Sequence, residues 1–101
     1  MSRKVCVQFE VRDQLIMKDT LKEMGFNFSE SGDRLQVSSS YGISIDCGSG
    51  NIRYDDVDER NVNKIKQQYT INYYRNKAIK EGMQLREERN AKGEVIITLS
   101  H

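Results

Sequence analysis

The chain has 101 residues, of which 37% are hydrophobic and 31% are charged, and its formal net charge at pH 7 is +1. A chain of this length builds a modest core without disulfide or metal staples, so residues 1–101 are predicted to form a single domain. The balanced charge excludes a global electrostatic attraction to nucleic acid, membranes or acidic partners, and any charge-based function must be local.

The opening residues, MSRKVCVQFEV, lack the apolar core and the cleavage site of a signal peptide, and no segment is long and apolar enough to span a membrane. We therefore expect a cytoplasmic protein with no membrane partner. Cys6 and Cys47 show no CxxC spacing, and the one histidine is His101. The sequence therefore predicts no metal ligand set, no cofactor and no Cys-His catalytic pair.

The first part of the chain predicts a strand, a helix and a hairpin. Alternating apolar residues favour a strand over 4–11, with Cys6 on its polar face, within reach of thiol reagents. Asp13 is expected to cap a helix, and Gly25 is expected to end it. Two short strands within 26–39 then form a hairpin around the turn SESGD.

The middle of the chain predicts a second hairpin and an acidic helix start. Residues 41–47 alternate as a strand, and GSG at 48–50 reads as a hairpin turn, because a strand follows it and not the helix that a phosphate loop requires. The cluster DDVDE at 55–59 lacks the spacing and the glycine of a calcium loop. We expect Asp56 or Asp58 to cap the next helix.

A long helix is predicted over 58–81, and its apolar stripe changes side along the way. The stripe first follows one face and then the nearly opposite one: Val62, Ile65 and Tyr69, then Ile71, Tyr74 and Ala78. Because one straight helix cannot bury both faces in one core, we expect a kink or a break near Thr70. This facing also predicts that Tyr69 is buried with Ile65 and that Tyr73 is substantially exposed.

The last segment, 83–99, predicts a hairpin around NAKG, with Gly93 at a left-handed bulge position and the charged run REER at 86–89 on a solvated edge. The segments LKEMGFNFSESGDRLQV and AIKEGMQLREERNAKGEVII share one pattern, a helix end with Lys-Glu, a glycine and a hairpin. This similarity is compatible with an internal duplication and with chance. The predicted fold class is α+β: two βαββ-like halves that share one mainly antiparallel sheet, with the helices packed on one face.

Two segments carry a family resemblance: VQFEVRDQLIMKDTLKEMGF and QQYTINYYRNKAIKEGMQLREERNAKGEVIITL. They resemble a small uncharacterised family of cyanobacterial, plastid and phage-encoded proteins of unknown function. Tyr69, Asn72 and Gly82 match the late-helix pattern of that family, whereas the middle segment SYGISIDCGSGNIRYDD is shorter and lacks its tryptophans. Members tend to be encoded near an AAA-type ATPase, so the resemblance implies at most an adaptor role.

The candidate binding residues form a basic, tyrosine-containing stripe on the long helix, in which Lys66, Tyr73, Lys77 and Lys80 share one side and Arg75 flanks them. Such a stripe can bind phosphates and stack a base. A solvated helix face is the alternative reading, and the near-zero net charge favours it.

No pair of carboxylates and no placed histidine points to acid-base catalysis, so we expect a protein that is not an enzyme. The leading hypothesis is a non-catalytic interaction or adaptor module that self-associates or docks on a larger partner such as an ATPase. The alternative is nucleic-acid or nucleotide-phosphate binding through the basic helix face. Residues 35–40 carry no charge and are expected to be covered, either by the other half or in a homodimer through the first hairpin or the Cys6 strand.

Overall fold

The structure is a computed structural model that describes residues 3–100. Within these residues it is an α+β fold of two α-helices, a short 3₁₀ helix and seven strands, in agreement with the predicted class. In chain order the elements are β1 (Lys4–Gln8), α1 (Gln14–Glu23), β2 (Phe28–Ser31), β3 (Arg34–Val37), β4 (Ile43–Asp46), β5 (Asn51–Asp55), η1 (Asp56–Asp58), α2 (Glu59–Glu81), β6 (Gln84–Arg89) and β7 (Val95–Ser100).

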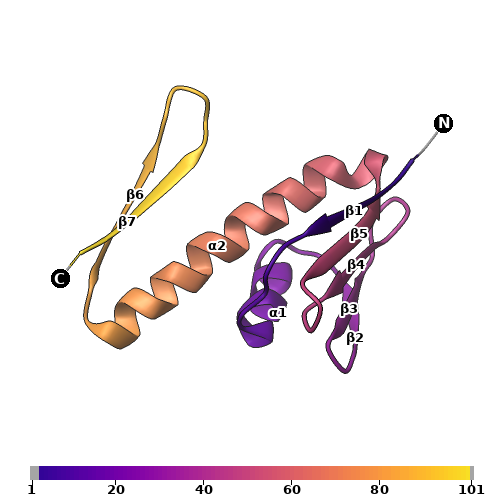
Figure 1. Cartoon of the computed structure of the whole chain (residues 1–101), viewed down its shortest axis with the longest axis horizontal. Helices are drawn as coiled ribbons and strands as arrows, with labels where there is room; N and C mark the ends of the chain where they lie inside the picture. The colour runs from indigo at the N-terminus through magenta and orange to yellow at the C-terminus, as the bar shows by residue number, and fades with distance from the viewer. Residues whose placement is uncertain (1–2, 101) are drawn as a thin grey trace.

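The strands form two antiparallel sheets, a five-stranded one of order β1-β5-β4-β3-β2 and the two-stranded hairpin β6-β7. The predicted β-α-β-β order of each half is present, but the expectation of one shared sheet is wrong. The reason is the length of α2, because its 23 residues span about 35 Å at 1.5 Å per residue. The helix therefore carries the last hairpin beyond the five-stranded sheet (Figure 1).

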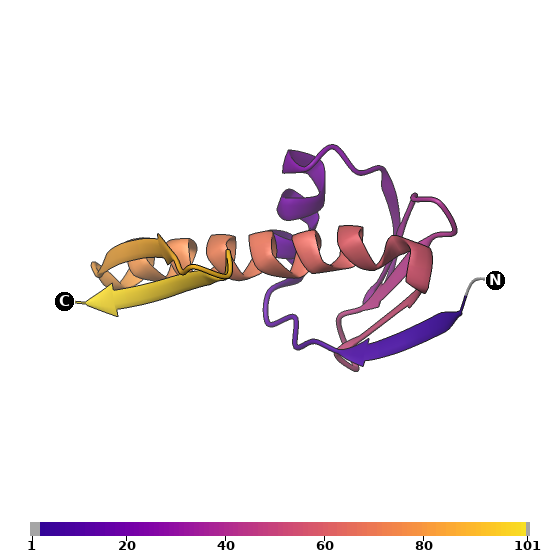
Figure 2. The same ribbon diagram turned by 90° about the horizontal axis from the view of Figure 1, so that it is seen from above.

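The core lies between one face of the five-stranded sheet and the two helices, which lie on the same side of that sheet (Figure 2). Alternation along the strands sends apolar side chains to this face. The fully buried strand residues are Leu35, Val37, Ile43 and Ile45, with Ile52 almost as deep. The cluster also contains Met17 and Leu21 of α1, Val62, Ile65 and Tyr69 of α2, Tyr54 of β5, and Val11. The predicted placement of the helices on one face is confirmed for this sheet.

The predicted ends of α1 are confirmed in detail. Asp13 caps the helix, and its Oδ1 accepts hydrogen bonds from the amides of Leu15 (3.0 Å) and Ile16 (3.3 Å). Gly25 follows the last turn with a φ of +83°, which is the left-handed conformation that a glycine supplies at low cost.

The long helix α2 is continuous from Glu59 to Glu81, and Figures 1 and 2 draw it as one nearly straight rod. The prediction of a kink or break near Thr70 is therefore wrong. The change of apolar face is real, but it is met by two different packing partners. Ile65 and Tyr69 pack in the core of the five-stranded sheet, whereas Ile71 and Ala78 are buried outside that core and Ile71 lies next to residues of the hairpin.

The acidic helix start also differs from the prediction. Asp58 is the N-cap of α2 but makes no side-chain capping bond, and its Oδ2 accepts the amide of Tyr41 at 3.1 Å. Asp55 caps η1 by accepting the amide of Val57 at 3.3 Å, and Asp56 accepts the amide of Arg3 at 3.2 Å. The carboxylates therefore hold the chain around this turn, and α2 takes its start from the preceding 3₁₀ turn.

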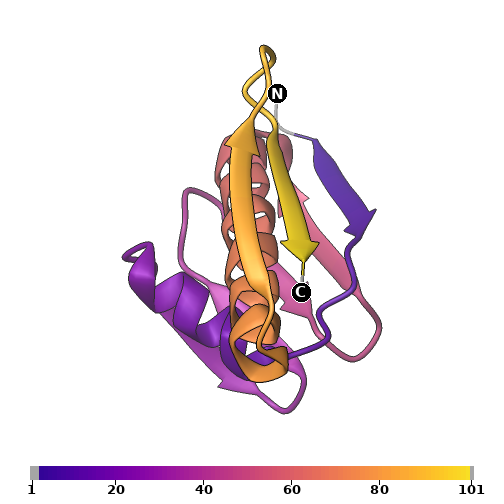
Figure 3. The same ribbon diagram turned by 90° about the vertical axis from the view of Figure 1, so that its left-hand side faces the viewer.

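The molecule is elongated, with extents of 47 × 35 × 24 Å and a radius of gyration of 14.3 Å, against about 13 Å for a compact domain of this length. We call residues 3–69 the body and residues 70–100 the arm. The arm comprises the second half of α2 and the hairpin, which doubles back along the helix (Figure 1). Viewed from the end of the molecule, β6 lies over α2 and β7 lies beside it (Figure 3).

Candidate functional site

The predicted basic stripe is divided between two sides of α2. Lys66 and Lys77 are half-buried on one side and Lys80 is exposed near them. Arg75 lies roughly 180° around the helix from Lys66 at 100° per residue. There its guanidinium forms an ion pair with Glu87 of β6, with an Nη2 to Oε1 distance of 2.7 Å. Arg75 therefore connects the hairpin to the helix and does not belong to the surface that the lysines share.

Tyr73 is half-buried, so the prediction that it is substantially exposed is wrong. Its ring stacks on Tyr69 with a centroid distance of 6.0 Å and meets Tyr74 edge to face at 5.3 Å. The burial of Tyr69 is confirmed, since only 4% of the residue is exposed. The Tyr69 hydroxyl accepts the amides of Arg12 (3.0 Å) and Asp13 (3.2 Å), and burial raises the pKa of Tyr69 despite these bonds.

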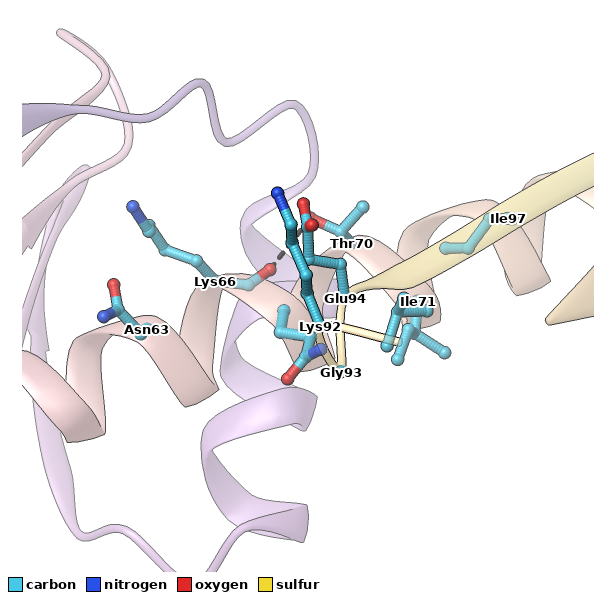
Figure 4. A pocket seen from close by; sticks show the side chains of 10 residues that line it. Asn63, Lys66, Thr70, Ile71, Lys92, Gly93, Glu94 and Ile97 are labelled. Carbon is cyan, nitrogen blue, oxygen red and sulfur yellow. Dashed lines mark hydrogen bonds between the residues drawn. The ribbon is translucent and has the colours of Figure 1, made fainter. Parts of the chain in front are cut away.

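An open groove of about 810 Å³ lies between α2 and the hairpin (Figure 4). Its helix wall consists of Asn63, Lys66, Gln67, Thr70 and Ile71, and its hairpin wall of Lys92, Gly93, Glu94, Val95 and Ile97. A second hollow of about 430 Å³ shares Thr70, Val95 and Ile97 with the first and adds Tyr74 and Leu99. Because their linings share these three residues, we treat the two hollows as one groove along β7, and no residue of β6 lines either of them.

The groove has an apolar floor and a basic mouth. Val95, Ile97 and Leu99 face the helix but are only half-buried, because a single helix cannot cover both strands of the hairpin. In Figure 4 the side chain of Lys66 extends from the helix towards the upper left, and that of Lys92 extends upwards from the hairpin turn. The site can therefore accept apolar side chains next to groups that attract negative charge.

The backbone of β7 adds unpaired hydrogen-bonding groups to this groove. The Asn90 amide donates to the Glu94 carbonyl at 3.0 Å, which makes these two residues a hydrogen-bonded pair. Hydrogen-bonded and non-hydrogen-bonded pairs alternate along an antiparallel ladder. The β7 residues whose backbone groups point away from β6 are therefore Val95, Ile97 and Leu99. Their N–H and C=O groups point to the free edge of the two-stranded sheet.

The two edges of the hairpin differ in charge. The β6 edge carries the run Arg86–Arg89, which is exposed as predicted, and charged residues protect an edge against strand addition. The β7 edge, VIITLS, has six residues and no charge. The sequence analysis predicted this strand as part of a hairpin but did not identify it as an unprotected edge. The available signal was the absence of charge in 95–100, in contrast to the charged run 86–89 on the other strand.

The remaining predicted features form no chemical site. Cys6 is exposed, as predicted, whereas burial raises the pKa of the Cys47 thiol to about 11 and keeps that thiol protonated at neutral pH. The GSG segment is the predicted turn, in which Asp46 Oδ1 accepts the amides of Gly48 and Ser49 at 3.0 Å. Within residues 3–100, no group of three or more His, Cys, Asp or Glu side chains is arranged to hold a metal ion.

No family model, no curated protein and no solved structure matches this chain. The resemblance to the cyanobacterial, plastid and phage-encoded family therefore stays a prediction. Neither helix in residues 3–100 combines the length and the apolar character that a membrane span requires.

Proposed function

We propose that this chain is a non-catalytic protein-interaction module that binds an extended segment of another protein along β7. The docking surface, which we call the β7 strip, consists of the free edge of β7 and the groove beside it. The observation that carries the proposal is an uncharged six-residue strand whose alternate backbone groups are unpaired. An extended segment adds to such an edge through main-chain hydrogen bonds, and adjacent hollows accept its side chains.

The contrast with β6 supports this choice of edge. Exposed uncharged edges invite association, and proteins usually protect them with charges, as β6 does with Arg86–Arg89. An unprotected edge beside an open groove is therefore a feature that a binding function would explain. A strand added to β7 would also cover the half-exposed side chains of Val95, Ile97 and Leu99, which contributes about 25 cal/mol for each Å² of apolar surface removed from water.

The other predicted modes have weaker support. For a nucleic-acid interface on α2, Arg75 is already engaged in its ion pair with Glu87, and one face of the Tyr73 ring already stacks on Tyr69. Of the uncharged run 35–40, the part within β3 is covered, by β2 and β4 of the same chain, whereas Ser38 and Ser40 are exposed. The coverage of β3 therefore gives no reason for a second copy at the first hairpin.

A displayed library of random decapeptides, selected on the immobilised protein, tests the proposal. Selected peptides should lose binding by about tenfold or more in Ile97→Pro, since proline removes an outward N–H and blocks the added strand. The ladder to β6 stays intact in this variant, because the Ile97 amide is not part of it. Glu87→Pro is the matched control, because Glu87 pairs with Ile97 and its amide points to the opposite edge. Arg75→Gln accounts for the ion pair that this control also removes.

A second pair of variants guards against a local distortion at Ile97. Leu99→Pro should also abolish binding, whereas Leu85→Pro, at the paired position of β6, should not. Enrichment of no peptide would overturn the proposal. Peptides that bind Ile97→Pro and Leu99→Pro as well as the unmodified chain would overturn it too.

A further inference from the structure

The charges around the β7 strip define which kind of segment it accepts, and this inference rests on the proposed function. A strand added to β7 lies about 4.8 Å beyond it and passes over the side of α2 that lines the groove. That side carries Lys66 and Thr70. Lys77 lies within about 20° of Thr70 at 100° per residue, so it shares this side further along the helix. Alternate side chains of the added strand would point towards these residues.

Within residues 3–100, Lys66, Lys77 and Lys92 form no ion pair. Among residues 3–100, the ion pairs involve other cations, namely Arg12, Lys18, Arg75 and Arg86. Glu94 is the one carboxylate in the groove lining, and its Oε1 accepts a hydrogen bond from the Asn90 side chain at 3.2 Å. The lining therefore carries two lysines, Lys66 and Lys92, against the single carboxylate of Glu94, and Lys77 adds positive charge further along the helix. A bound segment with negative charge would complement this net positive charge.

The same lysines oppose a second copy of this chain as the occupant. A two-fold pairing of β7 with β7 would make a four-stranded sheet with both copies of α2 on one face. Because β6 lies over α2, the two helices would lie three strand spacings, about 14 Å, apart. The facing sides of the helices would then bring Lys66 and Lys77 of one copy towards those of the other. Like charges at this spacing repel, and no acidic residue of β7 offsets them.

We infer that the β7 strip binds an extended acidic segment of another protein, in which an apolar residue that enters the groove is flanked by carboxylates two positions away on either side. The spacing follows from the helix, because the eleven-residue step from Lys66 to Lys77 spans about 16 Å. Carboxylates four residues apart on a strand are about 13 Å apart. The flexible lysine side chains cover the difference.

Three synthetic nonapeptides, VTETVTETV, VTQTVTQTV and VTKTVTKTV, test the inference as fluorescent probes in anisotropy titrations. The glutamate peptide should bind about three- to tenfold more tightly than the glutamine peptide, as two partly exposed ion pairs would give. The lysine peptide should bind most weakly, and the preference should fade at about 0.5 M salt. Equal binding of the glutamate and glutamine peptides would overturn the acidic preference and leave strand addition standing.

Variants assign the preference to the groove. Lys66→Gln combined with Lys77→Gln should remove the preference for glutamate while the glutamine peptide still binds. The control is Lys64→Gln, which alters an exposed lysine roughly 160° around the helix from Lys66 and should change nothing. Failure of all three peptides to bind would count against strand addition itself. A dimer in sedimentation that Ile97→Pro converts to a monomer would overturn the inference in favour of a second copy.

Discussion

The body and the arm use one helix in two different ways. In the body, α2 and α1 cover a five-stranded sheet together, and Leu35, Ile45 and Ile65 are at most 1% exposed. In the arm, the second half of the same helix is the sole cover of a two-stranded sheet, and Val95 and Ile97 stay half-buried. A hairpin with one helix as its only support keeps open edges and incomplete burial, so the arm is the region with surface left for a partner.

The largest expected difference between the two regions comes from removing one leucine from each. Leu35→Ala should lower the free energy of unfolding by about 2–5 kcal/mol, because it leaves a cavity in a closed core. Leu99→Ala should cost only about 1 kcal/mol, since the half-exposed site loses less burial and can relax. Urea unfolding measures both, and equal losses would mean that the arm is as tightly packed as the body.

The next effect concerns the hydroxyl that joins α2 to the start of α1. Tyr69→Phe leaves the amides of Arg12 and Asp13 without an acceptor and should cost about 1–3 kcal/mol. Tyr73→Phe is the control, because its ring stacking survives the change, and it should stay within about 0.5 kcal/mol. A comparable loss in both variants would contradict the role assigned to Tyr69.

Tyr69 also predicts an alkaline limit to stability. Its pKa is raised in the folded chain, chiefly by burial, whereas in the unfolded chain it ionises near pH 10. As the pH rises, the Tyr69 hydroxyl therefore loses its proton in the unfolded state first. The contribution of neutral Tyr69 to the free energy of unfolding is present below about pH 10 and declines above it. The decline should be smaller in Tyr69→Phe when unfolding is followed between about pH 9 and pH 11.

The smallest expected effect is that of the ion pair across the arm. Arg75→Gln should lower stability by no more than about 1 kcal/mol, because both side chains are partly exposed to solvent. The double variant Arg75→Gln with Glu87→Gln should cost little more than either single change. A thermodynamic cycle over these variants measures the coupling, and a coupling well above about 1 kcal/mol would make the pair a principal clamp of the arm.

Much of the fold could be predicted because its signals are local. Alternation defined the strands, and Asp13 and Gly82 marked helix ends where the structure has them, Gly82 with a φ of +66°. The straightness of α2 could not be predicted, since a change of apolar face near Thr70 is equally compatible with a kink and with two packing partners. The choice depends on where the last hairpin folds, which is a tertiary property.

The candidate site was predicted only in part, for the same reason. Lys66 and Lys77 were identified from the helix pattern, but Arg75 was grouped with them because its pairing with Glu87 of the hairpin is invisible in the sequence. Tyr73 was expected to be exposed because helix geometry alone does not reveal its stacking on Tyr69. The groove exists only where β7 folds back on α2. The sequence therefore predicted the strand that forms its floor but not the groove.

Amide hydrogen exchange with and without the glutamate nonapeptide is the most direct test of the β7 strip. In the free protein, the outward amides of Val95, Ile97 and Leu99 should exchange fast, and those of Ile96 and Thr98, which face β6, should exchange more slowly. On peptide binding, the outward amides should become protected while those of Glu87 and Arg89 on the other edge stay unchanged. Protection on the β6 edge or in the five-stranded sheet, with none at Val95, Ile97 and Leu99, would contradict strand addition at β7.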